Sequence, residues 1–485
     1  MNIEIQARPE LLHGPNPFIE RVPGLIPFSD LPRRLNKSYS VDWQSIPPAY
    51  REPLLDDMSQ RFVSTAQVLE PAAGIQKLFR QALASNNPVR KEEQRRVNQV
   101  GVSLSVESIK KTQSMNGGGM ILKGMTGSGK TALIERTLEI IAPHQVIDHE
   151  DCEAWGMYGL KQCVYLRIDH ASNGTRGGLL KRILHGLDEA LGTGYFQQHQ
   201  RTGNIDSLLV VVCKLLVHHR VALLCIDEKQ QSNFQDSPWA LEFVLFYMQL
   251  MNLGVSVVLA GNPLAFEQLE SSSQVMRRFS VGGDHALKPA TSVIEPWWAR
   301  DFVPMARQFS VVESWAIDPE LRSQLEFRYS GGLVGLFAVL HIEAQRSALR
   351  RAKSSATVTE EDYSVAIDSP QFRNLKKIAE AIRLEGPANN HFVDIPDNVA
   401  APKVKMPPEA SKENFSGLSK SQVNVLGRHL KNYKSQVTRN ANKLQAKLEQ
   451  IKNLSEDDIR MLGITKSHIE SMYETLEAQK KNLKK

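Results

Sequence analysis

The stretch Gly124-Met-Thr-Gly-Ser-Gly-Lys130-Thr131 decides the fold, because it satisfies G-x-x-x-x-G-K-[ST] at every fixed position. The apolar run 120–123 precedes it as a predicted buried strand, and residues 131–141 follow with the apolar spacing of a helix. Glycines let a backbone curl around an anion without Cβ clashes, and a helix N-terminus adds partial positive charge. The stretch therefore predicts a phosphate-binding loop between a strand and a helix.

This loop predicts binding of a nucleoside triphosphate with Mg²⁺. We expect Lys130 to contact the β- and γ-phosphates and the Thr131 hydroxyl to ligate the metal. The structural alternative is a glycine-rich turn before an ordinary helix, which the full motif in this context disfavours. The predicted nucleotide-binding residues are Gly124, Met125, Thr126, Gly127, Ser128, Gly129, Lys130 and Thr131.

A second acidic motif follows the continuously apolar run 221–226, which is typical of a strand buried on both faces of a parallel sheet. Asp227 is placed to hold the Mg²⁺ shell, directly or through water, and Glu228 to orient and activate an attacking water. Any strand can end in two acids, so this motif alone is weak. Its position, 97 residues after Lys130 with strand and helix patterns between, makes the two motifs together far more specific.

Asn262 follows another predicted buried strand, 255–260, where it could hydrogen-bond the γ-phosphate or the attacking water. An Asn used for the strand-to-helix turn before Pro263 is an equally good interpretation from the residues alone. Arg277 and Arg278 follow the next helix. They could form a solvated face, or one could reach the nucleotide of a neighbouring subunit and stabilise the transition state.

Length and composition indicate an ordinary globular chain of two or three domains. The chain has 485 residues, of which 41% are hydrophobic and 23% charged. Its four cysteines are scattered, which favours neither a disulfide framework nor a zinc site and suits a reducing cytoplasm. The N-terminal residues lack the apolar core of a signal peptide, and charged and His residues interrupt the most hydrophobic region, 208–226. We therefore expect a cytoplasmic protein without a membrane contact.

The basic excess lies in the C-terminal tail. Residues 401–485 hold 17 Lys+Arg against 9 Asp+Glu, which leaves 42 against 44 in residues 1–400. A nucleic-acid or acidic-partner contact is therefore sought first in the tail.

Pattern changes along the chain predict five segments. These are an irregular, Pro-rich N-terminal arm (1–50), an α/β nucleotide-binding domain with N-terminal helices (51–296), a helical lid (297–385), a linker (386–410) and a basic helical tail (411–485). Within the second segment we expect a helical break at Pro71, a polar loop or helix end at 85–98 and one strand at 163–168.

The order of these motifs resembles that of the AAA+ ATPases, and within them the TnsC-type transposition regulators, with MuB and TniB as more distant relatives. The similarity covers roughly residues 40–370. Its most specific stretches are Cys163-Val-Tyr-Leu-Arg-Ile-Asp-His-Ala-Ser-Asn-Gly-Thr-Arg, Leu187-Asp-Glu-Ala-Leu-Gly-Thr-Gly-Tyr195, Ile226-Asp-Glu-Lys-Gln230, Tyr329-Ser-Gly-Gly-Leu-Val-Gly335 and the segment around Trp43 and Pro47-Pro-Ala-Tyr-Arg51.

The resemblance implies an AAA+ P-loop core, with a parallel sheet in the order 5-1-4-3-2 and flanking helices, plus an α-helical lid. It implies Lys130 and Thr131 for phosphate and Mg²⁺, Asp227 for Mg²⁺, Glu228 for hydrolysis and Asn262 as γ-phosphate sensor. Arg277 or Arg278 would then act in trans. Many AAA+ proteins carry a lid arginine that touches the γ-phosphate, but residues 330–335, Ser-Gly-Gly-Leu-Val-Gly, offer none.

The resemblance also implies rings or spirals on duplex DNA, held through phosphate contacts in the pore. The candidate DNA-binding residues are Thr175, Arg176, Lys181 and Thr193, each of which could equally be a solvated surface residue. We expect an ATP-dependent regulator that oligomerises on target DNA and couples a target-selector protein of the TniQ or TnsD kind to the transposase subunits. The alternatives are another AAA+ DNA machine, such as a replication initiator or clamp-loader subunit, a nucleotide-gated scaffold with little hydrolysis, or a small-molecule P-loop kinase.

Overall fold

A computed structural model describes residues 7–40, 42–111, 117–170, 175–229, 240–266, 273–352, 354–383, 392 and 395, without the side chains of 228, 229, 240–242, 244 and 274. The chain divides into two compact units, Met1–Lys403 and Val404–Lys485, and every described residue lies in the first. The predicted tail, 411–485, and most of the predicted linker, 386–410, therefore lie outside the described residues.

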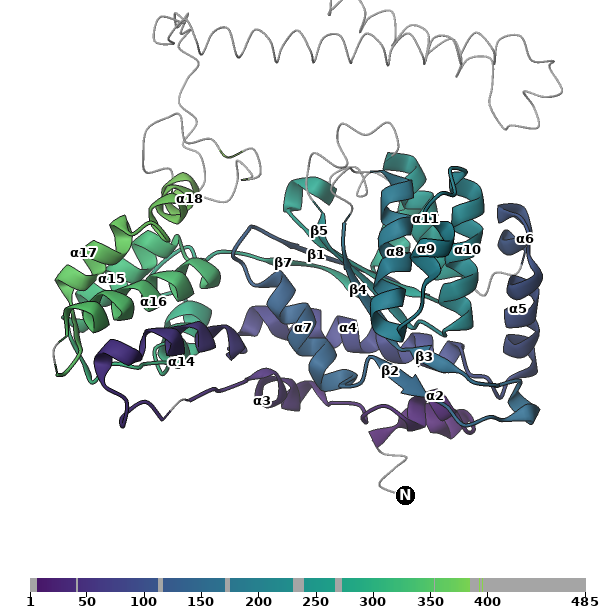
Figure 1. Cartoon of the computed structure of the whole chain (residues 1–485), viewed down its shortest axis with the longest axis horizontal. Coiled ribbons are helices and arrows are strands. Elements are labelled where there is room, and N and C mark those ends of the chain that lie inside the picture. The colour runs from purple at the N-terminus through teal and green to yellow at the C-terminus, as the bar shows by residue number, and fades with distance from the viewer. Residues whose placement is uncertain are drawn as a thin grey trace, which may run out of the picture. The chain divides into compact units, whose positions relative to one another are not determined.

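A five-stranded parallel sheet forms the centre of the fold (Figure 1). Its spatial order is β4-β5-β6-β1-β7, and each neighbouring pair is parallel. Numbered along the chain, this is the order 5-1-4-3-2, so the fold expected from the sequence is confirmed. The strands are β1 (Gly119–Gly124), β4 (Tyr165–Asp169), β5 (Leu223–Lys229), β6 (Ser256–Gly261) and β7 (Gly283–Leu287).

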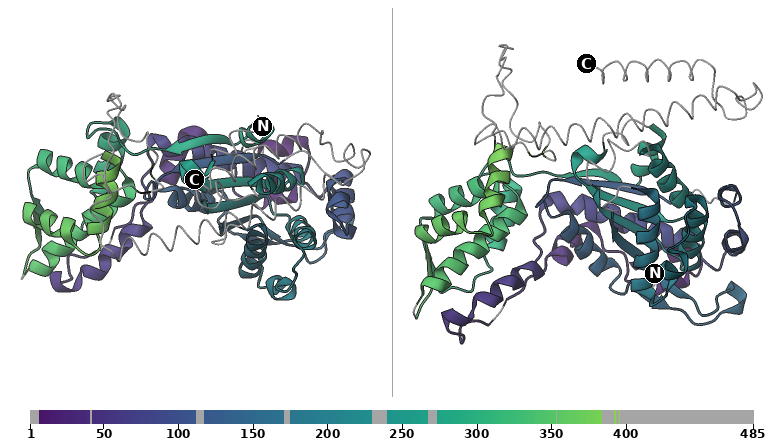
Figure 2. Two further views of the ribbon diagram at one scale, coloured as in Figure 1. Left: turned by 90° about the horizontal axis from the view of Figure 1, so that it is seen from above. Right: turned by 45° about the horizontal axis from the view of Figure 1, so that its top comes forward.

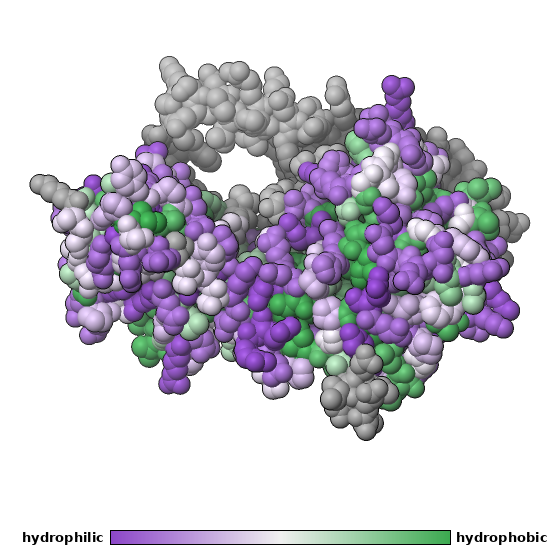
Figure 3. Space-filling model, turned by 60° about the horizontal axis from the view of Figure 1, so that its bottom comes forward, coloured by the Kyte–Doolittle hydropathy of each residue, from purple (hydrophilic) through white to green (hydrophobic). Residues whose placement is uncertain are grey.

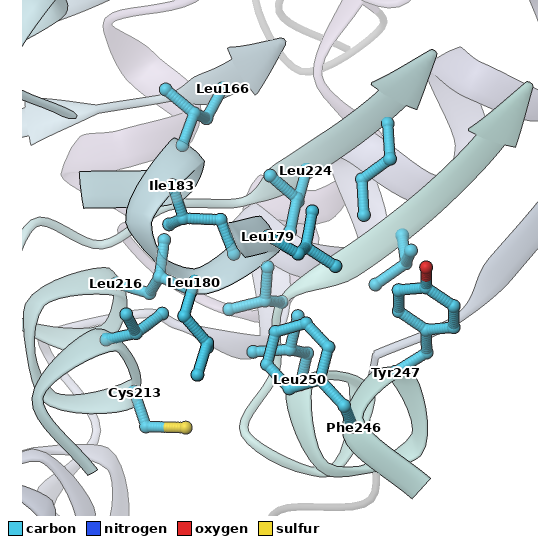
Figure 4. Close-up of a cluster of buried hydrophobic side chains, with 14 of the residues drawn as sticks. Leu166, Leu179, Leu180, Ile183, Cys213, Leu216, Leu224, Phe246, Tyr247 and Leu250 are labelled. Carbon is cyan, nitrogen blue, oxygen red and sulfur yellow. The ribbon is translucent and has the colours of Figure 1, made fainter. Parts of the chain in front are cut away.

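Both faces of the sheet are buried, because successive side chains of a strand point to opposite faces and here both sets are apolar. Ile226 and Leu259 face one core cluster, whereas their chain neighbours Cys225 and Ala260 face the other. Figure 1 shows α4 and α7 on one side of the sheet and α8, α10 and α11 on the other. Figure 4 shows the cluster on the side of α8, α10 and α11, where Leu179 lies beside Leu224. The result is a three-layer α/β/α domain.

The helices of this domain match the predicted apolar periodicity. Asn204 caps α10 by accepting hydrogen bonds from the N–H groups of Asp206 and Ser207. The helices are α4 (Ala66–Ser85), α5 (Lys91–Val102), α6 (Val106–Lys110), α7 (Lys130–Ile141), α8 (Arg176–Leu191), α9 (Tyr195–His199), α10 (Ile205–His218), α11 (Ala240–Asn252) and α13 (Ser273–Phe279), with 3₁₀ turns at Glu153–Trp155 and Pro263–Phe266.

Three local expectations were wrong. The predicted strand 163–168 is two elements, because residues up to Cys163 pair in an antiparallel hairpin of β2 (Val146–Asp148) and β3 (Lys161–Cys163) before β4 begins. Pro71 does not break a helix but lies inside α4, where burial of Ile75 and Leu78 offsets a cost of about 3 kcal/mol. The polar stretch 85–98 begins with the end of α4 and a turn, as expected, but from Lys91 it forms a helix, α5, which a buried ion pair of Glu93 with Arg220 anchors to the domain.

The lid consists mainly of four helices after residue 297. These are α15 (Pro319–Ser330), α16 (Val334–Arg351), α17 (Glu360–Asp368) and α18 (Arg373–Arg383), preceded by a π-helical turn (Trp297–Phe302) and α14 (Val303–Ala306). Two short parallel strands, β8 (Ser314–Ala316) and β9 (Thr357–Thr359), precede α15 and α17 and pair with each other. Thr359 opens α17 in a capping box with Asp362. The helical lid predicted from the sequence is therefore present.

The N-terminal segment is irregular, as expected, but it is packed on the rest of the unit. Phe18, Leu31 and Leu35 are fully buried in the core cluster on the α4–α7 side. Farther along, Leu55 is buried among lid residues, and Figure 2 shows this part of the chain, in dark purple, beside the green lid helices. The segment contains α2 (Pro17–Glu20), α3 (Leu31–Leu35) and the 3₁₀ helices Pro9–His13, Phe28–Asp30, Pro48–Tyr50 and Glu52–Gln60.

The surface of the described residues is mainly polar. Figure 3 presents a mainly hydrophilic face with separate apolar patches. Exposed large apolar side chains in the described part of the chain include Leu104, Ile294 and Tyr50, which is ordinary for a globular surface. None of the helices in the described ranges has the length and apolar character needed to cross a bilayer.

Candidate nucleotide site

The loop 124–131 has the backbone shape of an anion cradle. It lies between the end of β1 and the start of α7, and Gly127 and Gly129 have φ angles of +83° and +88°. Residues that carry a side chain rarely adopt this left-handed backbone conformation, so both positions favour glycine. A Cβ on Gly124 would lie 2.3 Å from Ser128 Oγ, which leaves no room for a side chain there. The loop is therefore shaped by its glycines.

Three hydrogen bonds link the loop to itself and to the sheet. The Lys130 ammonium donates to the carbonyl oxygens of Gly124, at 2.7 Å, and Met125, at 3.0 Å. The Thr131 hydroxyl donates to Asp227 Oδ2 at 2.6 Å. Residues 96 positions apart thus meet at the loop, and the ammonium, hydroxyl and carboxylate lie together at the carboxyl edge of the sheet.

Parallel pairing explains why the acidic motif reaches this edge. Asp227 pairs with Asp169 of β4, and the end of β6 at Gly261 pairs with Lys123 of β1. Asp227 is only 1% exposed. Burial and the charge of Asp227 raise the pKa of the neighbouring Cys225 to about 12, so this thiol stays protonated and packs as an apolar group.

The structure places the predicted Asn262 at the same edge, directly after β6, where its side chain is buried. Its Oδ1 accepts a hydrogen bond from Leu264 N at 3.0 Å, which is the turn-forming role that the sequence left open. Glu228 lies in β5 immediately after Asp227, but its side chain lies outside the described ones. The catalytic assignments of both residues stay predictions.

A mostly apolar hollow of about 260 Å³ adjoins the loop. Ser128 and Gly129 of the loop form one side, and the lid contributes Val334. Aromatic side chains also line the hollow: Phe62 of the N-terminal segment, and Trp297 and Phe302 at the start of the lid. An apolar slot beside a phosphate cradle has the chemistry to hold a purine base.

Arg277 and Arg278 differ in their surroundings, although both belong to α13. The Arg278 guanidinium is half-buried and donates to Asn252 Oδ1 of α11 at 2.9 Å. The Arg277 side chain is exposed. The structure thus engages Arg278 within its own chain and leaves Arg277 at the surface.

The four predicted DNA-binding residues do not form one patch. Thr175 caps α8 by accepting from Gly178 N, and Arg176 is its first residue. Lys181 donates to the Gln200 carbonyl oxygen at 2.9 Å. Thr193 follows the other end of α8, a helix of 16 residues or about 24 Å, and donates to Asp188 at 2.6 Å. Thr175 and Thr193 therefore cannot contact the same phosphate.

Sequence reasoning missed the walls of the hollow. Phe62, Trp297 and Phe302 come from segments more than 200 residues apart, and no spacing in the sequence links them. The sequence did single out residues 330–335 for lacking an arginine, but it gave no sign that this stretch contacts the loop. Gly335 N–H donates to the Gly127 carbonyl oxygen at 2.8 Å.

The sheet order, the glycine loop after β1, the acidic end of β5 and the following helical lid together define an AAA+ P-loop NTPase fold. In agreement with this class, residues 113–269 match the sequence model of the AAA domain family. No curated protein sequence matches the chain significantly.

Three solved structures illustrate the structural similarity. Orc1 of Aeropyrum pernix in complex with DNA is 17% identical, with 60% of this chain and 68% of that chain covered and a TM-score of 0.37. Cdc6p of Pyrobaculum aerophilum is 13% identical, with 62% and 82% covered and a TM-score of 0.36. Drosophila ORC bound to DNA is 15% identical, with 61% and 69% covered and a TM-score of 0.32. At this distance, ligands and partners must be argued from the site itself.

Proposed function

We propose that the chain is an ATPase of the TnsC type, which binds target DNA in its ATP form and couples target selection to a transposase. The observation that carries the nucleotide part is the 2.6 Å hydrogen bond between Thr131 and Asp227. This bond joins the two halves of the predicted site at the edge of the sheet where the glycine loop ends.

The residues fit ATP and Mg²⁺. The loop keeps its curled shape because Gly127 and Gly129 have positive φ angles and because a side chain on Gly124 would meet Ser128. A hydroxyl and a carboxylate oxygen, which are hard donors, lie together at Thr131 and Asp227, and Mg²⁺ prefers such ligands. When bound, Mg²⁺ neutralises charge on the phosphates. The hollow lined by Phe62 and Trp297 would take the base.

Each side chain then has a distinct task. Lys130 exchanges its contacts with the loop carbonyls for phosphate oxygens, and Thr131 and Asp227 hold the metal. Glu228 orients the attacking water and accepts its proton, and Asn262 contacts the γ-phosphate. Asn262 must then release or share its bond with Leu264 N.

Arg277 is the better candidate for the arginine that acts in trans. Its side chain is exposed and could reach a neighbouring nucleotide, whereas Arg278 is engaged by Asn252. Arginine supplied from outside a site stabilises the charge of phosphoryl transfer. Hydrolysis would accordingly require oligomers, in rings or spirals.

The DNA and transposition parts rest on the resemblance of residues 40–370 and on charge. The excess of 8 positive charges in residues 401–485 favours binding to a polyanion or an acidic partner. Contacts at Thr175, Arg176, Lys181 and Thr193 would require DNA to follow the length of α8. The transposase subunits, a TniQ- or TnsD-like selector and the site's ATP specificity belong to this proposal. Another AAA+ DNA machine, or a scaffold with little hydrolysis, is the alternative.

The experiment compares duplex DNA binding and assembly, seen by electron microscopy, with ATP, ADP and a slowly hydrolysed ATP analogue. We expect filaments or rings on DNA with ATP or the analogue and none with ADP. Glu228→Gln should trap the assembled state, and Arg277→Ala should lower turnover about 1,000-fold, with Arg278→Ala as its neighbour for comparison. Equal DNA binding in all nucleotide states would refute the switch. Unchanged turnover in Glu228→Gln would refute the role of Glu228.

A further inference from the structure

The lid touches the phosphate loop through backbone atoms. Gly335, in the first turn of α16, donates its N–H to the Gly127 carbonyl oxygen at 2.8 Å. A Cβ on Gly335 would lie 2.9 Å from that oxygen and 3.0 Å from Gly127 Cα, and a Cβ on Gly127 would lie 2.9 Å from Leu336. The two backbone segments approach this closely because each has a glycine at the contact.

Met125 makes a second contact between the loop and the lid. Its side chain is 3% exposed, although it lies within the loop itself. It packs in one cluster with Leu333 and Leu336, at the start of α16, and with Ala379 and Ile382 of α18. Burying a methionine side chain contributes about 2 kcal/mol, so this contact holds the lid against the loop.

The backbone of Met125 faces the site. The Lys130 ammonium donates to its carbonyl oxygen at 3.0 Å and to that of Gly124 at 2.7 Å. Lys130 is the residue that the proposed function assigns to the phosphates, so nucleotide binding must change the contacts of Met125. One residue thus has its carbonyl oxygen in the site and its side chain in the lid.

The cluster continues into the last described helix. Leu375 and Ile378 of α18 pack against it, and so does Ile395, which lies beyond α18 on the way to the C-terminal residues. The polar side of α18 carries Arg373, Lys376, Lys377 and Arg383. A shift of Met125 would therefore reach the segment that leads to the basic tail. Packed clusters transmit such shifts because they deform little.

We propose that Met125, with the Gly335–Gly127 contact, positions the lid according to the nucleotide state of the loop, in place of a lid arginine, which residues 330–335 do not offer. The inference rests on the proposed nucleotide binding and deepens it. Met125 is a positioning residue, since it acts through Lys130 and α18. Nucleotide binding releases Lys130 from the Met125 carbonyl oxygen, the loop readjusts, and α18 follows the methionine side chain.

The test is hydrogen–deuterium exchange of the full chain with and without ATP analogue, followed separately in residues 124–131 and in α18. In the unmodified chain we expect the analogue to change exchange of α18 by about fivefold or more. In Met125→Ala the α18 response should be lost, and in Ile382→Ala, which lies outside the loop, the loop should still respond while α18 does not. Met125→Leu, which keeps an apolar side chain of similar volume, should restore the response of α18.

Further variants make the outcome decisive. Ile382→Ala approaches the cluster from the lid and should abolish the same response, and the double variant should add nothing more. Val365→Ala, on the exposed side of α17, should respond like the unmodified chain. An undiminished α18 response in Met125→Ala would overturn the inference alone. A loop that does not respond in the unmodified chain would overturn the proposed function with it. If Met125→Ala loosens the lid even without nucleotide, the α18 responses of Met125→Leu and Ile382→Ala test the inference instead.

Discussion

The carboxyl edge of the sheet and the interior of the lid both bury charged side chains, yet they use them differently. In the lid, Glu326 accepts from Arg307 at 2.6 Å, from Arg322 at 2.9 Å and from the Tyr363 hydroxyl at 2.6 Å. At the sheet edge, Lys130 instead donates to carbonyl oxygens of its own loop, and Asp227 is contacted by the Thr131 hydroxyl.

This comparison separates the charges of the lid, which stabilise the fold, from those at the sheet edge, to which we assign ligand binding. Burial alone would raise the pKa of Glu326, but the Arg322 and Arg307 charges hold it below its usual value. Burial, with the Glu326 charge, raises the pKa of Tyr363 well above its ordinary value, so the hydroxyl remains a donor. The Glu326 carboxylate finds all of these partners within the lid. The edge, with its glycine cradle, has donors that can be redirected to phosphate.

The largest effect on stability should come from the lid. Glu326→Gln leaves the buried Arg322 guanidinium and the half-buried Arg307 guanidinium without a carboxylate, and losing one partner of a buried pair costs about 3–5 kcal/mol. Chemical denaturation measures this change. Glu320→Gln, on the exposed first turn of the same helix, is the matched control and should change little. Equal stability of the two variants would mean that the network is not what holds the lid.

The sheet edge should behave in the opposite way. Lys130→Ala should weaken nucleotide binding about 100-fold, or about 3 kcal/mol, while stability without nucleotide changes by less than about 1 kcal/mol. A fluorescent nucleotide analogue reports the affinity, and Lys77→Ala, at an exposed position of α4, is the control. A large loss of stability in Lys130→Ala would place this lysine with the structural charges instead.

A titration sharpens the contrast from the lid side. Burial lowers the pKa of His341 from 6.5 to about 4, and its Nε2 contacts the Phe309 carbonyl oxygen at 2.7 Å. Below pH 6.5 the unfolded chain takes up a proton that the folded lid refuses, so stability falls as pH falls towards 4. Between pH 6.5 and 5 the loss approaches about 2 kcal/mol. His341→Gln should lose less over this range in denaturation experiments, and equal pH slopes would contradict the assignment.

The smallest effect is expected at the lid surface. Arg350 pairs with Glu52 at 2.5 Å, but its side chain is 63% exposed. Exposed pairs contribute about 0–1 kcal/mol, so Arg350→Ala should barely change the denaturation midpoint. A loss comparable with that of Glu326→Gln would show that this exposed pair stabilises the fold as much as the buried network of the lid does.

Much of this arrangement could be predicted from the sequence. The sheet order followed from the resemblance to the AAA+ ATPases, which the phosphate loop, the apolar strands and the order of motifs supported. They also placed Lys130, Thr131 and Asp227 at one edge, because parallel strands bring their carboxyl ends together. Local patterns carry such information well when a strand is apolar throughout.

Other features depended on contacts that no local pattern records. Pro71 was expected to break a helix, but tertiary burial of α4 outweighs its intrinsic cost. Residues 163–168 look like one strand, although a neighbouring hairpin takes the first of them. Met125 occupies a freely variable position of the motif, so its burial in the lid could not be anticipated.

The route of the N-terminal segment has a mechanical consequence. A backbone bridge between Lys37 and Phe62 closes the chain between them into a loop, and lid residues hold its far part through Arg51–Glu313 and Arg346–Glu52 pairs. Besides its contacts with the phosphate loop, the lid is attached to the α/β domain along the chain by the loop 37–62 and by residues 288–296. A body on one tether can swivel freely, whereas a body on two is restricted to turning about the line that joins them. The lid should thus turn along one arc, while Phe62, which pairs with Lys37 and packs on the core of the α/β domain, stays in place at the edge of the hollow.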